Sequence, residues 1–322
     1  MNNKILIVTG DPNSINSEII YRTFSKLNNK IKNRIYIISN FNLLNEQFKK
    51  LKFKIKLEEV KSLNNIRSSD GLKIIDVALN FHNPFNVSAK NASKFVIDCL
   101  NMAHTIAVKK KINGIINCPI DKKLIKKTKK VGITEFLAHK CNLKKNTEVM
   151  MIYNKNLSVV PLTTHIKIKD VSKLINYKLI KNKIMTLNKC YKKLFKRTPK
   201  IAVLGLNPHN SEYSKKSEET LNIIPSISKL RKRGLNIFGP FVSDTFFIEK
   251  YKKFDVVIGM YHDQVLTPFK TIFHFNAINI TLGLNYIRVS PDHGPGKDIV
   301  GKKKANYMSL LQCVKFISRL KK

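Results

Sequence analysis

The sequence lacks any long apolar run. Its apolar stretches, such as residues 201–206 and 255–260, fall far short of the roughly 18 to 20 residues that a membrane-spanning helix requires. The N-terminal residues lead directly into a strand-like segment, with no apolar region followed by a small-residue cleavage site. These absences argue against a membrane protein and against a secreted one, and we expect a cytoplasmic protein.

Cysteine is also scarce. The five cysteines are odd in number, scattered and without a CxxC pair: Cys99, Cys118, Cys141, Cys190 and Cys313. A disulfide scaffold or a zinc ribbon needs paired and regularly spaced cysteines, so the pattern argues against both. Reduced thiols in a cytoplasm fit this pattern.

Acidic residues are few: 21 Asp and Glu stand against 60 Lys and Arg, which gives a net charge of +39. Such an excess is typical of nucleic-acid-binding proteins, because a basic surface releases counterions from phosphates. The lysines are dispersed, however, with clusters only at 122–130 and 301–306, and no zinc finger or aromatic and basic platform accompanies them. This favours compositional bias over a nucleic-acid partner, which we keep as the alternative. In either case a positive field favours anionic substrates.

The sequence contains an alternation of short apolar runs and longer amphipathic segments. The runs predict strands at residues 4–10, 34–39, 114–119, 148–153, 157–163, 201–207, 255–260 and 277–283. Most are continuous, which is typical of strands covered on both faces. Helical spacing predicts a helix over about 88–111, and an acidic start near Ser217 with a basic end before Gly234 predicts another. We therefore expect an α/β protein with a mixed or largely parallel sheet.

Polar clusters follow several of these runs, at the strand ends where open α/β sheets bind ligands. His165, His209 and His262 each lie just beyond a predicted strand. Because such ends converge in an α/β sheet, we expect the three imidazoles to lie near one another. Three imidazoles suit a borderline divalent ion such as Zn²⁺ or Co²⁺ and leave positions open for substrate. No HExxH motif is present, and separate structural histidines are the alternative.

Several strings resemble the 4-hydroxythreonine-4-phosphate dehydrogenases of pyridoxal phosphate biosynthesis. They are GMYHDQVLTPFK (259–270), NITLGLNYIRVSPDHG (279–294), DIVGKKKAN (298–306), TTHIKIKDV (163–171) and GLNPHNSE (205–212). The likeness is collinear over most of the chain. The last loop also resembles the NAD-contacting loop of isopropylmalate and isocitrate dehydrogenases.

The resemblance implies a two-lobed α/β/α fold of the isocitrate and isopropylmalate dehydrogenase type, with mixed sheets and a cleft between the lobes. We expect a first lobe over 1–127 and 277–322 that carries the NAD-binding loop. A second lobe over 128–276 is expected to carry the metal histidines and the dimer contacts. The resemblance also implies a homodimer in which the second subunit completes the active site.

The implied reaction is the NAD-dependent oxidation of 4-phosphooxy-L-threonine at its C3 hydroxyl. The β-keto acid then loses CO₂ and gives 3-amino-2-oxopropyl phosphate. The resemblance assigns a divalent metal (Zn, Co or Mg) to His165, His209 and His262, where it would act as a Lewis acid. Asp263 is expected to orient the neighbouring imidazole of His262.

Substrate binding is assigned by the same resemblance to Lys270, Asn279 and Arg288, with Thr134 in the substrate loop. A guanidinium grips a carboxylate or phosphate with two hydrogen bonds, whereas an ammonium supplies a point charge. Lys270 is also a candidate catalytic residue. Asp244 is a candidate acid or base, with a helix N-cap as the alternative.

The resemblance of the last loop assigns binding of the dinucleotide to His293, Gly294, Gly296 and Asp298. Glycines there would let the backbone approach the dinucleotide closely. A plain basic turn is the alternative interpretation.

Two strings depart from the family's pattern. The first turn, usually GDPAGIGPE, reads GDPNSINSE (10–18) and loses its glycines. The substrate loop, usually GHTE, reads GITE (132–135), so Ile133 stands where a substrate-contacting histidine is expected. An isoleucine neither hydrogen-bonds to phosphate nor moves a proton. A related dehydrogenase for threonate or erythronate 4-phosphate is therefore the alternative function.

Overall fold

The computed structural model describes residues 4–63, 71–109, 112–128, 132–143 and 147–320. The chain divides into two compact units, Met1–Cys141 with Asn285–Lys322, and Asn142–Leu284. Both boundaries differ from the expected lobe limits, because residues 128–141 lie in the first unit and residues 277–284 in the second. Thr134 therefore belongs to the first unit and Asn279 to the second.

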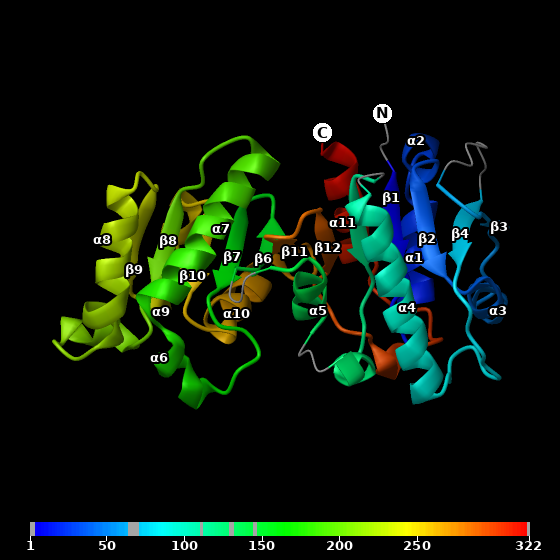
Figure 1. Cartoon of the computed structure of the whole chain (residues 1–322), viewed down its shortest axis with the longest axis horizontal. Coiled ribbons are helices and arrows are strands. Elements are labelled where there is room, and N and C mark those ends of the chain that lie inside the picture. Colours follow the sequence, from blue (N-terminus) through cyan, green and yellow to red (C-terminus); the bar gives the residue numbers. More distant parts are fainter. Residues whose placement is uncertain (1–3, 64–70, 110–111, 129–131, 144–146, 321–322) are drawn as a thin grey trace. The chain divides into compact units, whose positions relative to one another are not determined.

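The first unit is built on parallel strands with helices on both faces (Figure 1). The strands run in the order β3-β4-β2-β1-β5-β12, and every neighbouring pair is parallel. Their bounds are β1 (Ile5–Val8), β2 (Ile35–Ser39), β3 (Leu57–Glu59), β4 (Leu72–Asp76), β5 (Gly114–Asn117) and β12 (Arg288–Pro291). The central β1, β2 and β5 are buried throughout, as continuous apolar runs predict.

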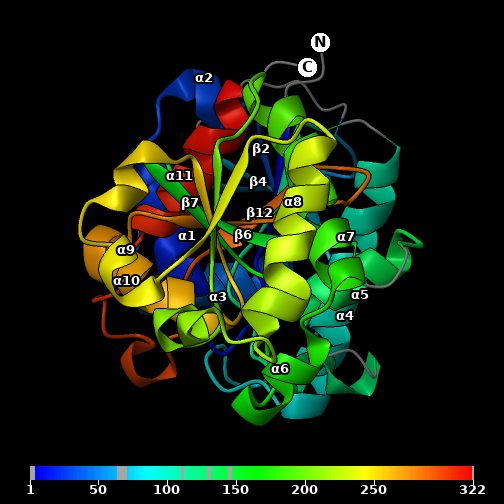
Figure 2. The ribbon, with the colours of Figure 1, turned by 90° about the vertical axis from the view of Figure 1, so that its left-hand side faces the viewer.

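The helices of the first unit are α1 (Asn16–Ser25), α2 (Asn29–Lys32), α3 (Phe41–Lys50), α4 (Ala89–Val108), α5 (Ile133–Lys140) and α11 (Met308–Arg319). Figure 2 separates α4 from α1 and α11, which pack together on the other face of these strands. The helix predicted at 88–111 is confirmed as α4. Its N-cap is Ser88, whose hydroxyl accepts a hydrogen bond from the Asn91 amide at 3.4 Å.

The second unit has a mixed sheet in the order β11-β6-β7-β10-β8-β9. β6 is antiparallel to β11 and β7, and the remaining pairs are parallel. The strand bounds are β6 (Val149–Asn154), β7 (Leu157–Pro161), β8 (Ile201–Leu204), β9 (Ile237–Phe241), β10 (Val256–Gly259) and β11 (Ile278–Leu282). The mixed sheet agrees with the sequence prediction.

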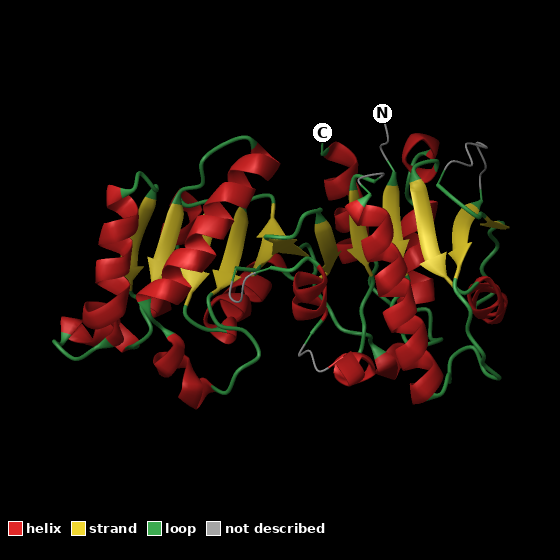
Figure 3. Cartoon of the chain, viewed as in Figure 1, coloured by secondary structure: helices red, strands yellow, loops and turns green. Residues whose placement is uncertain are grey.

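Helices cover this second sheet as well (Figure 3). They are α6 (Val171–Leu174), α7 (Tyr177–Phe195), α8 (Ile224–Lys232), α9 (Ser243–Phe246) and α10 (His262–Phe273). The helix predicted to begin near Ser217 consists of a π-helical turn, Glu219–Ile223, followed by α8 with Pro225 in its first turn. Nowhere in the described ranges is a helix both long and apolar enough to cross a membrane.

Four strands, β3, β4, β9 and β12, were not predicted because each interrupts the apolar pattern. β3 holds two glutamates in three residues, and β9 holds Gly239 and Pro240, residues that sheets tolerate at their edges. β4 contains the buried Lys73, and β12 begins with the buried Arg288. A charged residue interrupts the apolar pattern of a short strand. Because its partner is distant in the sequence, the sequence gives no sign that the charge is buried.

Candidate active site

The three predicted metal histidines follow three neighbouring strands of the second unit. β10 pairs in parallel with β7 on one side, where Gly259 lies opposite Pro161, and with β8 on the other. His165, His262 and His209 come after the carboxyl ends of β7, β10 and β8 respectively. The strand order therefore places all three segments at one edge of this sheet, the edge where ligands bind in α/β folds.

His165 and His262 lie close together, with ring centroids 6.0 Å apart. His262 is the first residue of α10 and follows the extended N-cap residue Tyr261. Its Nδ1 lies 2.6 Å from Asp263 Oδ1. Because this contact engages Nδ1, it leaves Nε2 as the atom that can bind a metal.

His209 lies in a turn with an unusual backbone. Residues His209 to Tyr213 all have positive φ values, between 47° and 58°, which costs roughly 1–2 kcal/mol per residue other than glycine. A buried carboxylate anchors this turn: Glu219 Oε1 accepts hydrogen bonds from Leu206 N at 2.7 Å and Asn207 N at 2.8 Å. Burial opposes ionisation of Glu219, but the hydrogen bonds from Asn207 and Leu206 outweigh it and lower the pKa of this carboxyl.

The donor chemistry at this edge suits a divalent ion. The spacing of the His165 and His262 rings is compatible with one ion bound to both at about 2.0–2.1 Å from each nitrogen. In the part of the chain that the structure describes, no three His, Cys, Asp or Glu side chains are arranged to hold one ion. The described residues therefore do not place His209 together with His165 and His262, and the three-histidine site stays a prediction.

The other predicted residues of the second unit lie on three elements. Asp244 is exposed in the first turn of α9, whose N-cap is Val242, so the N-cap interpretation of Asp244 is wrong. Lys270 is exposed on α10, about two turns after His262. Asn279 lies on β11, and its buried Oδ1 has no hydrogen-bond partner among the described residues. A polar ligand would satisfy such an amide oxygen.

In the first unit, Arg288 is buried at the start of β12. Its Nε donates to Asn117 Oδ1 at 2.5 Å, and its Nη1 donates to Thr134 Oγ1 at 3.4 Å. Burial lowers the pKa of Arg288 to about 10, so the guanidinium stays charged at neutral pH. The fold thus brings together two predicted substrate residues, Thr134 and Arg288. Ile133 is the first residue of α5, directly before Thr134.

Two glycines of the predicted dinucleotide loop differ in their surroundings. Gly296 has a φ of 59°, and a Cβ there would lie 3.1 Å from Ile15 Cδ1. In the same loop, the carbonyl oxygen of Pro295 accepts a hydrogen bond from Ile15 N at 3.1 Å. Gly294 has open space around the position of a Cβ. Gly296 is therefore needed for packing within the fold, whereas Gly294 leaves room for a ligand.

The neighbouring residues hold this loop in place. His293 Nδ1 lies 3.0 Å from the carbonyl oxygen of Gly294. Lys297 forms an ion pair with Asp121, and this hydrogen bond lowers the pKa of Asp121. Asp298 follows in a short 3₁₀ helix, Lys297–Ile299.

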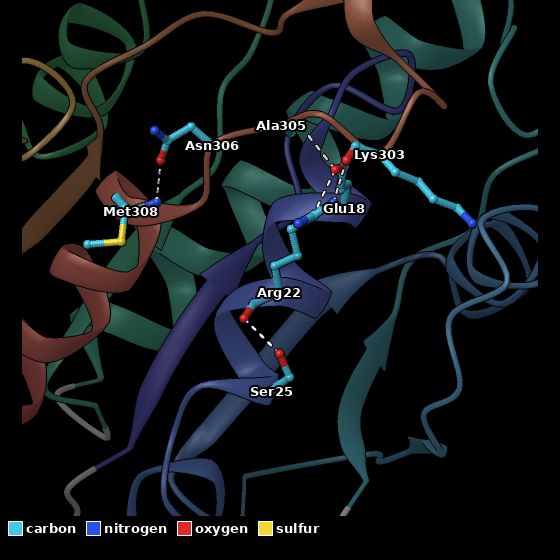
Figure 4. A network of polar contacts seen from close by, with 7 residues as sticks. All are labelled: Glu18, Arg22, Ser25, Lys303, Ala305, Asn306 and Met308. Carbon is cyan, nitrogen blue, oxygen red and sulfur yellow. Dashed lines mark hydrogen bonds and ion pairs between the residues drawn. The ribbon is translucent and has the colours of Figure 1, made fainter.

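The end of the loop is fixed to α1 (Figure 4). The buried Glu18 accepts hydrogen bonds at Oε1 from Ala305 N at 3.0 Å and from Arg22 Nε at 2.9 Å. Arg22 also donates to the carbonyl oxygen of Lys303. Asn306, which lies just before the N-cap residue of the next helix, accepts a hydrogen bond at Oδ1 from Met308 N, the first amide of α11, at 2.9 Å. The helix after the first turn therefore anchors the segment that follows the predicted dinucleotide site.

Polar side chains replace the glycines that the first turn lacks. Asn16 Nδ2 donates to the carbonyl oxygens of Thr9 at 2.7 Å and Pro119 at 2.8 Å. Ser14 Oγ donates to the carbonyl oxygen of Asp11 at 2.5 Å. This departure from the family's pattern therefore keeps the turn tied to the fold.

Three residues next to the candidate site were not predicted: Asn117, Glu219 and Gln264. Asn117 ends β5, and Gln264 follows β10 by a few residues, so a position at a strand end was the only signal in the sequence. Glu219 lies in the helix expected near Ser217, where helix polarity alone explained its charge. Met260 lies four residues before Gln264, and the more distant hydrogen-bond partners of these residues are brought to them by the fold.

The family model of the pyridoxal phosphate biosynthetic protein PdxA matches residues 30–317. The chain is 38% identical to the 4-hydroxythreonine-4-phosphate dehydrogenase of Sulfurihydrogenibium sp., over 99% of this chain and 98% of the relative. It is 35% identical to that of Aquifex aeolicus, over 99% of both chains.

Solved structures agree with this result. The 4-hydroxythreonine-4-phosphate dehydrogenase of Klebsiella pneumoniae superposes with a TM-score of 0.86 at 26% identity, covering 98% of this chain and 100% of that one. A Burkholderia phymatum enzyme of the same name gives a TM-score of 0.81 at 29% identity, covering 99% of each chain. These matches confirm the α/β fold class. Since the likeness extends over the full length in both sequence and structure, the chain belongs to the PdxA family of pyridoxal phosphate biosynthetic proteins.

Proposed function

We propose that the chain is a 4-hydroxythreonine-4-phosphate dehydrogenase. It oxidises 4-phosphooxy-L-threonine with NAD and a divalent metal, and releases CO₂ to give 3-amino-2-oxopropyl phosphate. The observation that carries the proposal is the approach of His165 and His262 to a ring-centroid distance of 6.0 Å, at the ligand-binding edge of a chain of this family. Full-length relatives that bear this enzyme name support the same substrate.

His165 and His262 would hold the divalent ion (Zn, Co or Mg), with His209 as the predicted third ligand. The ion, when bound, supplies Lewis-acid chemistry: it acidifies the substrate hydroxyl and stabilises negative charge on that oxygen. Asp263 engages His262 Nδ1 and so fixes the tautomer and orientation of the ring. Neutral imidazoles would leave the charge of the ion intact.

The substrate is an anion at both its carboxylate and its phosphate, and the predicted binding residues match this charge. Arg288 and Lys270 supply the two cations, while Thr134 and Asn279 supply a hydroxyl and an amide. The buried guanidinium of Arg288 is held in one orientation by its hydrogen bond to Asn117, and in this proposal its positive charge attracts an anionic group of the substrate.

The proposed reaction has two steps. In the first, the C3 hydride passes to NAD and the hydroxyl proton passes to a base. In the second, the bond to the carboxylate breaks, CO₂ leaves, and its electron pair moves toward the ketone oxygen until the neighbouring carbon takes up a proton. Asp244 and Lys270 are the candidate proton carriers, and both are exposed on the second unit.

We assign NAD to the loop that contains His293, Gly294, Gly296 and Asp298. The open space at Gly294 allows the dinucleotide to approach the backbone. The carboxylate of Asp298 is of the type that accepts hydrogen bonds from ribose hydroxyls in other dinucleotide sites. Gly296 would serve by keeping the loop packed against Ile15.

A homodimer is part of the proposal. In the segment that follows His165, the large apolar side chains of Ile166, Ile168 and Leu174 are 39%, 67% and 43% exposed. Exposed large apolar side chains in one short segment suit a surface that another protein covers. In this proposal a second copy of the chain covers this surface and also supplies His209 as the third metal ligand.

Ile133 supports a second candidate function, a dehydrogenase for another four-carbon phosphoacid. It precedes Thr134 at the start of α5, where the family's pattern has a histidine. A hydrocarbon at this position removes one polar contact to the substrate. Threonate and erythronate 4-phosphates are the alternatives, because they share the phosphate and the hydroxyl groups.

An assay of NAD reduction tests the proposal. We expect turnover of 4-phosphooxy-L-threonine with added Zn²⁺, Co²⁺ or Mg²⁺, with a kcat/KM above that for threonate and erythronate 4-phosphates. The His262→Ala variant should lose this activity, whereas replacing His139, an exposed residue of α5, should not. Absence of turnover of 4-phosphooxy-L-threonine would exclude the leading function, and turnover of another phosphoacid alone would establish the second.

A further inference from the structure

The side chain of Gln264 joins three segments at the carboxyl edge of the second unit. Its Oε1 accepts a hydrogen bond from Met260 N at 2.7 Å, just after β10. Its Nε2 donates to Gly205 O at 2.6 Å, just after β8. The same nitrogen donates to Ser243 Oγ at 2.7 Å, at the start of α9. One amide therefore connects the ends of two strands and the start of a helix.

The chemistry of the partners fixes the orientation of this amide. A backbone N–H only donates and a backbone carbonyl only accepts, so Oε1 must face Met260 and Nε2 must face Gly205. Both N–H groups of Gln264 are engaged, since each of the two bonds from Nε2 uses one. A side chain without two donors and an acceptor in this arrangement cannot make all three bonds.

The surrounding backbone is packed too closely to adjust easily. A Cβ on Gly205 would lie 2.0 Å from Asn210 Oδ1, and a Cβ on Gly259 would lie 2.5 Å from Val265 Cγ1. These two glycines flank the segments that Gln264 joins. The position of each segment is therefore set jointly by close packing and by the bonds of this one side chain.

Each joined segment leads to a residue of the proposed site. Met260 lies two residues before His262, and Gly205 opens the segment that contains His209. Ser243 directly precedes Asp244. Gln264 itself is not expected to contact substrate or metal. Its hydrogen bonds instead fix the backbone segments from which the side chains of His262, His209 and Asp244 extend.

We propose that Gln264 is the positioning residue of the metal site, which sets the relative placement of the segments that carry His262, His209 and Asp244. This inference rests on the proposed function insofar as it concerns a metal. Loss of a residue that orients metal ligands typically lowers metal affinity by about 10- to 100-fold. We expect an effect in this range when the two donors of Gln264 are removed.

The most informative variant is Gln264→Glu. It keeps the length of the side chain and the acceptor for Met260 N, but it removes both N–H donors and places an oxygen against the carbonyl of Gly205. The Ser243→Ala variant removes only one of the three bonds and introduces no charge, so it serves if the first variant does not fold.

The first unit offers a matched control. Gln47 is buried, and its Nε2 donates to two carbonyl oxygens, Pro12 O at 2.9 Å and Pro84 O at 2.7 Å. The Gln47→Glu variant therefore makes the same chemical change in an amide that also joins two segments. We expect it to lower stability without changing the metal site.

Two measurements on the full-length protein test the inference. Hydrogen exchange without metal should be faster in Gln264→Glu than in the parent for residues 205–213 and 243–246, and unchanged there in Gln47→Glu. Titration with Co²⁺, followed by its visible absorption, should give a dissociation constant at least tenfold higher in Gln264→Glu than in the parent and in Gln47→Glu. Ser243→Ala should show the same changes to a smaller degree.

The outcomes separate this inference from the proposed function. If Gln264→Glu is folded and binds Co²⁺ like the parent, or if Gln47→Glu weakens Co²⁺ binding equally, Gln264 is not the positioning residue. If the parent itself does not bind Co²⁺, the metal-dependent function fails. Hydrogen exchange alone then decides the inference: faster exchange in the two named segments supports it, and unchanged exchange overturns it.

Discussion

At the scale of single residues, the buried cation of Arg288 requires an acceptor, and Asn117 provides one. The bond from Arg288 Nε to Asn117 Oδ1 is 2.5 Å long. Hydrogen bonds to charged groups contribute about 1.5–3 kcal/mol, and an unsatisfied buried group costs a similar amount. Asn117 is neutral, so it satisfies the guanidinium without cancelling the charge that an anionic substrate needs.

Two substitutions of Asn117 should separate these roles. Asn117→Leu removes the acceptor and should lower the free energy of unfolding by about 1–3 kcal/mol, measured by urea denaturation. Asn117→Asp keeps an acceptor but neutralises Arg288, so the KM for the phosphorylated substrate should rise by about tenfold or more, with a smaller loss of stability. An unchanged KM in Asn117→Asp would show that Arg288 is a structural cation only.

The sequence predicts some of these residues and not others, for a physical reason. His165 and His262 are recognisable because each follows an apolar run, and the order β7-β10-β8 brings the strand ends together. Met260 lies four residues before Gln264, and the more distant hydrogen-bond partners of Asn117, Glu219 and Gln264 lie on other elements of the fold. Such a partner leaves no spacing pattern, so only the fold identifies these residues.

At the scale of secondary-structure elements, the turn that carries His209 depends on its neighbouring helix. Its left-handed backbone is unfavourable. Glu219, at the start of the π-helical turn, offsets part of this cost by accepting hydrogen bonds from the two backbone amides of residues 206–207.

Partners on other elements also explain why two strands were not predicted. β4 and β12 carry a buried lysine and a buried arginine, and the groups that satisfy these charges lie on other elements.

Glu219→Gln should reveal this contribution through its pH dependence. The folded pKa of Glu219 is lowered, so the ionised carboxylate stabilises the fold above its ordinary pKa of 4.5, and the stabilisation is lost as pH falls through the lower, folded value. We expect the free energy of unfolding of the parent to exceed that of Glu219→Gln by about 1–3 kcal/mol at pH 7. The difference should shrink below pH 4.5. Urea denaturation between pH 3 and 7, values chosen to bracket that pKa, measures it.

Glu218 provides the control for this measurement. It is half-buried and accepts a single hydrogen bond at Oε2, from Asn207 Nδ2 at 2.8 Å. Glu218→Gln should lower the free energy of unfolding at pH 7 by less than Glu219→Gln does, because Glu219 accepts two backbone hydrogen bonds. An equal loss in both variants at pH 7 would show that the anchoring of the turn does not depend on the buried carboxylate of Glu219.

At the scale of the whole molecule, the excess of lysine has structural uses. Lys73 is buried, donates to the carbonyl oxygen of Asn33 at 2.8 Å and lies over the ring of Tyr36. Lys200 Nζ lies 5.1 Å from the ring centroid of Phe254, a core residue of the second unit. Lysines that pack in this way are consistent with compositional bias, and the remaining positive charge favours a phosphorylated substrate.

At this scale the proposal also predicts how the expected metal ligands are divided between subunits. Within one chain, the ring centroids of His165 and His262 are 6.0 Å apart. Among the described residues, no third donor joins them. If His209 reaches the site from the second subunit, each site of a homodimer takes ligands from both chains. A heterodimer of His209→Ala and His262→Ala subunits would then contain one site with both changes and one with neither.

Subunit mixing tests this arrangement. Each variant alone should be inactive, and the mixture should recover about a quarter of parental activity, because half of the dimers are mixed and each has one intact site of two. Mixing His165→Ala with His262→Ala is the matched control. If these two ligands come from one chain, every mixed site carries a single lesion, and no activity returns. Recovery in the control, or none with His209→Ala, would contradict a site that His209 completes from the partner.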